Sequence, residues 1–209
     1  MSETIEERLY SFRVDGKTGF INGTGQIIIE PKYEGACEFC YDEDYTFYIS
    51  NNKLGCIDRT GNIIIKALYD DLKLFSKEGL AAFLVDGKWG FINKNEEVVI
   101  NPIYNKADSF VNGLAGVEFQ DGKWGYIDCS GITVIKPVFE RVSEFWDKLA
   151  RVKLGGKFGF IDKAGKFVFE PIFDSANCFT GEDDLTVVEI DGKYGYININ
   201  GNWVWKPSK

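Results

Sequence analysis

The stretch Asp86-Gly87-Lys88-Trp89-Gly90-Phe91-Ile92-Asn93 decides the fold of this 209-residue chain, because it recurs with small changes at regular intervals. Aligned on Gly90, the chain repeats a glycine at steps of 36, 35, 35, 34 and 36 residues. The six glycines are Gly19, Gly55, Gly90, Gly125, Gly159 and Gly195. Lysine stands two residues before each of them and isoleucine two residues after. Such periodicity is the signature of a repeat protein, here of six units of about 35 residues.

Two antiparallel strands are predicted on either side of each Asp-Gly pair. Residues 150–154 alternate between apolar and charged side chains, which indicates a strand with one buried face and one face in water. The Asp-Gly pair supplies the positive φ of a tight hairpin. The second strand carries the repeated glycine, and we predict that a neighbouring aromatic ring fills the space beside it.

A third strand is predicted after a second turn. Asn or Asp ends the second strand in every unit, and glycine follows three residues later except at Glu96, as in a type I turn with a left-handed residue. The apolar run that follows, such as 63–65, is typical of a strand covered on both faces. Proline, or Ala67 in the second unit, then ends the ladder. The connection to the next unit has a polar residue that could cap a single helical turn.

The segments 86–93 and 121–128, each preceded by Gly-Leu-Ala, resemble the WG (KWG) repeat of bacterial proteins. The resemblance covers roughly residues 8 to 207. It divides one domain, residues 1–209, into units of approximately 8–42, 43–78, 79–112, 113–147, 148–183 and 184–207. Thr18 and Leu54 lack the expected aromatic side chain, and Phe158 and Tyr194 keep a ring without the indole. The resemblance implies an all-β tandem array that acts as an interaction module, and it implies no catalytic residues.

Six three-stranded units must stack face to face, because a unit this short cannot bury its own apolar surface. We favour a closed propeller-like or barrel-like array, since neither end unit looks capped. The apolar end residues are Ile27, Ile28, Ile29, Tyr194, Tyr196, Ile197, Trp203, Val204 and Trp205. An oligomer could also bury them. The alternative is an open twisted or solenoid array, because the chain starts on a first strand and ends on a third, and Thr18 and Leu54 could mark a cap.

Composition excludes several function classes. There are 24 Lys and Arg against 32 Asp and Glu, a net charge of −8, which disfavours nucleic acid. The chain has no His, so Ser-His and Cys-His catalytic pairs cannot form. The acidic pairs Asp70-Asp71, Glu96-Glu97 and Asp183-Asp184 are adjacent, so on strands they would face opposite sides. No signal peptide or membrane span is recognisable, and we expect a cytoplasmic protein without membrane contact.

The five cysteines are predicted to be free thiols, without a metal site or cofactor. They are an odd number, Cys37, Cys40, Cys56, Cys129 and Cys178, and lack zinc-ligand spacing. Cys37 and Cys40 form a C-x-x-C pair, but no βαβ pattern of the kind that accompanies a redox motif surrounds them.

These observations predict a non-enzymatic bacterial scaffold that mediates protein–protein interaction. The alternative is a multivalent module that binds a glycan or an anionic ligand through repeated lysines or rings. The candidate contacts are Lys17, Lys53, Lys88, Lys123, Lys157, Lys193, Trp89, Trp124 and Tyr194. Each has a simpler explanation, because a lysine after Asp-Gly is an ordinary hairpin residue and a repeated ring is an ordinary core residue.

Overall fold

The computed structural model describes residues 8–40, 43–146, 148–179 and 184–206, and its regular elements are all β-strands. This part of the chain contains no helix, and therefore none that is long and apolar enough to cross a membrane. The single helical turn predicted for each connection is wrong. The backbone there instead pairs with the strand that follows it.

Six antiparallel sheets succeed one another along the chain, and each is built from three long strands. The first, here called hairpin strands, are β1 (Leu9–Val14), β5 (Tyr45–Ser50), β9 (Leu80–Val85), β13 (Leu114–Glu118), β17 (Leu149–Leu154) and β21 (Leu185–Ile190). The glycine strands are β2 (Lys17–Asn22), β6 (Lys53–Asp58), β10 (Lys88–Asn93), β14 (Trp124–Asp128), β18 (Lys157–Asp162) and β22 (Lys193–Asn198). The outer strands are β3 (Ile27–Tyr33), β7 (Ile63–Tyr69), β11 (Val98–Tyr104), β15 (Thr133–Phe139), β19 (Phe167–Phe173) and β23 (Trp203–Trp205).

A fourth strand of two residues joins every sheet except the first, so the prediction of three-stranded units holds only for the first sheet. These short strands are β4 (Gly35–Ala36), β8 (Asp71–Leu72), β12 (Lys106–Ala107), β16 (Arg141–Val142) and β20 (Ser175–Ala176). Each pairs with the hairpin strand after it, as Leu72 does with Phe83. The connection from one outer strand thus supplies the inner edge of the next sheet.

The outer strands differ from the prediction in two respects. The four that contain the proline, β3, β11, β15 and β19, continue for two residues beyond it, and their pairing with the glycine strand shifts register beside it. At Gly90 a Cβ atom would lie 2.5 Å from the carbonyl oxygen of Ile100 and 2.8 Å from the nitrogen of Pro102. The glycine is therefore required by a close backbone approach, and not because a ring fills the space. The outer strands are also not covered on both faces, since Ile63 is 56% exposed.

The turn after every glycine strand is confirmed. In all six sheets the side-chain oxygen of the Asn or Asp accepts hydrogen bonds from the backbone N–H groups two and four residues later. For Asp58 these bonds come from Thr60 and Asn62, both at 2.9 Å. Asn and Asp oxygens accept such bonds well, whereas Ser and Thr hydroxyls do so more weakly, which favours Asn and Asp at this position.

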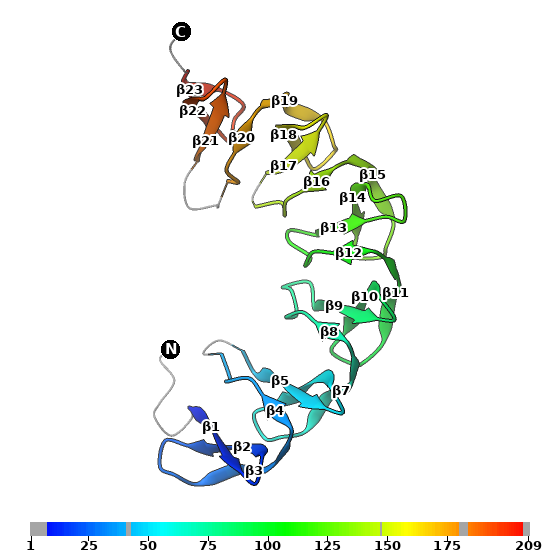
Figure 1. Ribbon diagram of the computed structural model, residues 1–209, viewed down its shortest axis with the longest axis vertical. Coiled ribbons are helices and arrows are strands. Elements are labelled where there is room, and N and C mark those ends of the chain that lie inside the picture. Colours follow the sequence, from blue (N-terminus) through cyan, green and yellow to red (C-terminus); the bar gives the residue numbers. More distant parts are fainter. Residues whose placement is uncertain (1–7, 41–42, 147, 180–183, 207–209) are drawn as a thin grey trace.

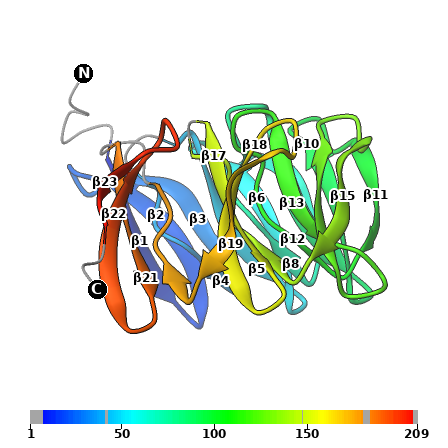
Figure 2. The same cartoon turned by 90° about the horizontal axis from the view of Figure 1, so that it is seen from above.

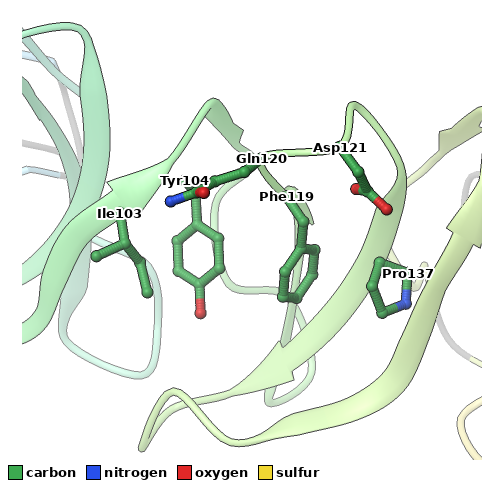
Figure 3. Close-up of a pocket in the computed structure, with 6 residues that line it drawn as sticks. All are labelled: Ile103, Tyr104, Phe119, Gln120, Asp121 and Pro137. Atoms are coloured by element: carbon green, nitrogen blue, oxygen red, sulfur yellow. The ribbon is translucent and has the colours of Figure 1, made fainter.

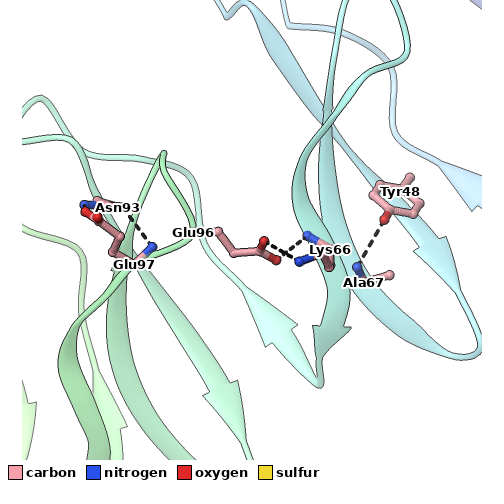
Figure 4. A network of polar contacts seen from close by, with 6 residues as sticks. All are labelled: Tyr48, Lys66, Ala67, Asn93, Glu96 and Glu97. Carbon is pink, nitrogen blue, oxygen red and sulfur yellow. Dashed lines mark hydrogen bonds and ion pairs between the residues drawn. The ribbon is translucent and has the colours of Figure 1, made fainter.

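Two exceptions to the repeat, Glu96 and Ala67, lie close together and each has a compensating contact (Figure 4). Glu96 takes the glycine position of the turn at φ 64°. Its carboxylate accepts a hydrogen bond from the backbone of Lys66 at 2.9 Å and pairs with the Lys66 Nζ at 3.0 Å. Ala67 replaces proline, and its N–H donates to the Tyr48 hydroxyl at 3.1 Å. Glu96 therefore links the third sheet to the second.

Consecutive sheets pack face to face around five buried clusters, one for each pair of neighbours. In the cluster between the third and fourth sheets, Phe91 and Ile100 point forward along the chain, and Val117 and Ile127 point back. Every interior sheet therefore has a forward face, which meets the next sheet along the chain, and a backward face, which meets the preceding sheet. Both faces are covered.

The six sheets form an open arc, with the short strands toward its inside and the outer strands toward its outside (Figure 1). The first and last sheets stand at the two separated ends of this arc. Viewed from above, they lie at the same height as the sheets between them, so the arc is flat (Figure 2). The closed array that we favoured is not seen, and the arrangement is the open alternative with a propeller-like curvature.

Candidate functional site

The forward face of the last sheet is an uncovered apolar surface, here called the C-terminal end face and formed by Leu185, Tyr194, Tyr196 and Trp205. Tyr196 and Trp205 pair across β22 and β23 at the positions that Phe91 and Ile100 hold in the third sheet. Phe91 and Ile100 are 0% and 6% exposed, whereas Tyr196 and Trp205 are 42% and 53% exposed. The side chains are of the same kind, and they are exposed because no other sheet of the described residues packs on this face.

The backward face of the first sheet is the second uncovered surface, the N-terminal end face, formed by Tyr10, Phe12, Val14 and Ile21. Phe12 lies opposite the glycine strand and Ile21 lies opposite the hairpin strand. They hold the positions that Phe83 and Ile92 hold in the third sheet. Phe83 and Ile92 are buried, while Val14 is exposed and Phe12 and Ile21 are half-buried. Each end thus presents the face that the other end would need as a neighbour.

The edge of the first sheet is protected although its face is not. Within the part of the chain that the structure describes, β1 has no short strand beside it, but the Glu38 carboxylate accepts hydrogen bonds from the Ser11 backbone N–H at 3.2 Å and from the Ser11 hydroxyl. In the third sheet the Lys73 backbone N–H bonds to the corresponding residue, Ala82. A charged side chain at a sheet edge opposes pairing with another strand.

Three of the six candidate lysines bind a side chain in the connection that follows the outer strand of their own sheet. Lys53 pairs with Asp70 at 2.5 Å, Lys157 pairs with Asp174, and Lys88 donates to the Asn105 side chain at 2.6 Å. Hydrogen bonding to Lys53 lowers the pKa of the Asp70 carboxyl. These contacts fix the connection against the hairpin. Lys17, Lys123 and Lys193 are exposed.

The candidate rings divide into two groups. Trp89 and Trp124 are half-buried and pack against the clusters ahead of their sheets, with Lys73 and Lys106 over their rings at 5.4 and 6.0 Å. Tyr194 holds the same strand position but is 59% exposed, because it lies on the C-terminal end face. The structure therefore does not bring the three rings together into one site.

A pocket of about 400 Å³ lies between the third and fourth sheets (Figure 3). Its walls are Ile103, Tyr104, Phe119 and Pro137, with Gln120 and Asp121 at its polar side. The rings of Tyr104 and Phe119 meet edge to face at 5.3 Å, and burial raises the pKa of the Tyr104 hydroxyl. The pocket can hold an apolar group, and its lining offers no nucleophile beside a base.

The cysteines and the acidic pairs singled out in the sequence are dispersed. All five cysteines are free, and burial raises the pKa of the Cys56 thiol to about 12. Among the described residues no group of three Cys, Asp or Glu side chains could hold a metal ion. Asp70 and Glu96 bind Lys53 and Lys66, whereas Glu97 binds Asn93. Asp183 lies outside the described residues.

Solved structures of similar fold are propeller-like. A eukaryotic initiation factor superposes with a TM-score of 0.59 at 12% identity, covering 95% of this chain and 61% of its own. Hsv2 of Kluyveromyces lactis gives 0.52 at 12% identity, with 92% and 71% covered. The computationally designed protein Ika8 gives 0.51 at 12% identity, with 98% and 74% covered. At these identities the likeness concerns the fold alone.

The sequence comparisons identify the repeat. No curated protein sequence matches the chain. The sequence profile of the WG containing repeat matches five consecutive segments, at residues 19–53, 55–89, 89–124, 124–158 and 158–194. Each match starts in the glycine strand of one sheet and ends in the glycine strand of the next, so five matches connect six sheets. The chain therefore belongs to the WG containing repeat family.

Proposed function

We propose that this protein is a non-enzymatic scaffold that mediates protein–protein interaction, and that its two end faces associate with those of further copies. The observation that carries the proposal is the pair of uncovered end faces. Side chains such as Tyr196 and Trp205 are exposed at positions that every interior sheet buries. Exposed apolar faces of this kind mark association surfaces in soluble proteins.

Association would run head to tail, with the C-terminal end face of one copy against the N-terminal end face of the next. Interior sheets meet in this way, forward face against backward face. Growth by edge pairing at β1 is opposed by Glu38, so face packing is the favoured route. A flat arc with matching ends could be completed by a second copy, which would give the closed propeller-like array.

The alternative function, multivalent binding of a glycan or an anionic ligand through the repeated lysines or rings, has less support. Lys53, Lys88 and Lys157 already bind neighbouring side chains, and Trp89 and Trp124 pack in the core. Those positions are better explained by the stability of the repeat.

Light scattering after size-exclusion chromatography tests the end-face proposal. The wild-type chain should show a mass above the 23.6 kDa of one copy, increasing with concentration. Tyr196→Glu and Val14→Glu should each give monomers, because each places a charge on one end face. Ile132→Glu is the matched control, since Ile132 is also an exposed apolar residue but lies in a turn away from both ends.

Mixing the two monomeric variants separates head-to-tail association from other modes. Tyr196→Glu keeps an intact N-terminal end face and Val14→Glu keeps an intact C-terminal end face. The mixture should therefore form a dimer with one functional interface. A monomeric wild-type chain, or a mixture that stays monomeric, would refute the proposal.

A further inference from the structure

The fifth sheet differs from the others in a row of side chains that crosses its inner edge. In each four-stranded sheet this row joins one residue of the short strand, one of the hairpin strand and one of the glycine strand. The rows are Gly35–Ile49–Leu54, Asp71–Leu84–Trp89, Lys106–Glu118–Trp124, Arg141–Lys153–Phe158 and Ser175–Glu189–Tyr194. Only the fifth sheet places two cations opposite each other.

The fourth sheet shows the arrangement that would be expected for stability. There Lys106 faces Glu118, and the two form an ion pair at 3.2 Å. In the fifth sheet Lys153 stands where Glu118 does, directly opposite Arg141. Like charges at facing positions of an antiparallel pair are destabilising. Since the protein as a whole is acidic, with a net charge of −8, this reversal is a local departure from its composition.

A third cation completes the cluster. Arg151 lies two residues before Lys153 on β17, so both side chains emerge on the same face of the strand. The Arg151 Cζ is 5.0 Å and the Lys153 Nζ is 5.3 Å from the centroid of the Phe158 ring. Arg151 also donates a hydrogen bond to the carbonyl of Ala176 in the sixth sheet, which holds the guanidinium at the junction of the two sheets.

These side chains line a pocket of about 340 Å³ whose walls are Arg141, Val142, Arg151, Lys153 and Phe158. No acidic side chain lines it, and among the described residues none of the three cations forms an ion pair. Three cations therefore surround the Phe158 ring in a pocket whose own lining holds no counter-charge. Arg151 also lines a second pocket, which contains Asp184. Arginine forks are well suited to bind carboxylates with two hydrogen bonds.

We propose that this pocket, the cationic groove, binds an extended acidic segment of a partner protein. The inference deepens the proposed scaffold function, on which it rests, by giving the chemistry of one partner. Arg151 and Lys153 follow each other at the spacing of alternate residues in a strand, about 6.6 Å. Carboxylates at alternate positions of an extended peptide have the same spacing, so two of them could meet Arg151 and Lys153 while Arg141 meets a third charge.

Fluorescence anisotropy with a labelled Ser-Glu-Ser-Glu-Ser-Glu peptide tests the groove, and the same peptide with Gln for Glu is the ligand control. The wild-type chain should bind the Glu peptide and not the Gln peptide, with affinity that falls as salt is added. Lys153→Glu should weaken binding by about tenfold or more, because it replaces an attraction with a repulsion. Arg141→Gln should weaken it less.

Lys153→Glu also has a readout that excludes misfolding. It recreates the arrangement of Lys106 and Glu118, so the urea midpoint should rise while peptide binding falls. Lys136→Glu is the matched control, because it makes the same change of charge at an exposed residue of β15 away from the groove. It should leave binding within twofold of the wild type.

Three outcomes would overturn the proposal: no binding of the Glu peptide, equal loss in Lys136→Glu and Lys153→Glu, or displacement of the peptide by an equal concentration of inorganic phosphate. The last would mean a site for small anions. A chain that self-associates but does not bind the peptide would refute the groove alone. A monomeric chain whose peptide binding depends on Lys153 would refute the end-face association alone.

Discussion

An interior sheet and an end sheet of this protein are built from the same strands, yet they differ in what covers them. Phe91 and Tyr196 occupy one strand position in the third and sixth sheets, and their exposed fractions are 0% and 42%. The difference comes from the neighbouring sheet and not from the unit itself. Stability in this array should therefore consist of contributions within a sheet, which are present in every unit, and contributions between sheets, which are missing on the outer faces of the two ends.

The largest effect is expected when a buried residue of an interior sheet is replaced by alanine and compared with the matching exposed residue of the end sheet. Phe91→Ala should reduce the free energy of unfolding by about 3–5 kcal/mol, because it removes a fully buried ring from the cluster between two sheets. Tyr196→Ala should cost less than about 1 kcal/mol in the monomer, as expected for an exposed position. Urea denaturation at a concentration where the wild type is monomeric makes the comparison. Equal losses would show that the end face is covered by some other part of the chain.

Replacing the repeated glycine by alanine should reduce the free energy of unfolding by a similar amount in an interior sheet and in an end sheet. Gly90→Ala and Gly19→Ala both place a Cβ 2.5 Å from a carbonyl oxygen of the outer strand in the same sheet. Because the clash lies within one sheet, each should cost about 1–3 kcal/mol or more, whether or not a neighbour covers that sheet. Hydrogen exchange in the affected outer strand would measure both. A much smaller loss at Gly19 would mean that the end sheet relaxes around the new methyl group.

The features that the sequence reveals are those fixed by one residue at one backbone position. Asn and Asp predicted the turns correctly because their oxygen must reach two N–H groups, and glycine gave the period of the repeat. The short strands escaped prediction because pairs such as Lys106-Ala107 and Arg141-Val142 share no pattern and form strands only beside the next hairpin. The proline was interpreted as a strand end because its close approach to Gly90 depends on the register shift.

The candidate sites depend on contacts between strands and sheets, so less of them could be predicted. The uncapped ends were visible in residues such as Tyr196 and Trp205. Closure was not, because it depends on the small rotation between successive sheets. The cationic groove was missed since Arg141 and Lys153 become neighbours only through the pairing of β16 with β17. The sequence did contain a signal for the groove, because Lys153 occupies in the fifth unit the position that Glu118 occupies in the fourth.

A smaller effect is expected at Glu96, where a contact between sheets replaces a glycine of the turn. Glu96→Ala keeps the left-handed backbone and loses the ion pair to Lys66, so it should cost about 1 kcal/mol. Glu96→Gly loses the same pair but relieves the backbone, so its unfolding free energy should be close to that of the wild type. Urea midpoints of the two variants test this. If both variants are equally destabilised, the backbone at Glu96 carries no strain.

The smallest effect concerns the acid dependence of a turn inside one sheet. Burial alone would raise the pKa of Asp58, but hydrogen bonds from Thr60 and Asn62 outweigh it and lower that pKa. The unfolded carboxyl therefore takes up a proton at higher pH than the folded one. Its contribution to stability is complete above the unfolded pKa of about 3.9 and is lost as the pH falls through the lower folded value.

Asp58→Asn imitates the turns at Asn22, Asn93 and Asn198, which keep the accepting oxygen but do not titrate. Between pH 7 and pH 3 the variant should lose less unfolding free energy than the wild type, by about 1 kcal/mol or less. The comparison concerns the change with pH, because the variant also loses the bond from the Asn62 amide and starts from a lower value. Since the turn lies within one sheet, Asp162→Asn in the fifth sheet provides a position with the same backbone bonds. An identical pH dependence of the wild type and Asp58→Asn would show that the turn carboxylate does not contribute through its charge.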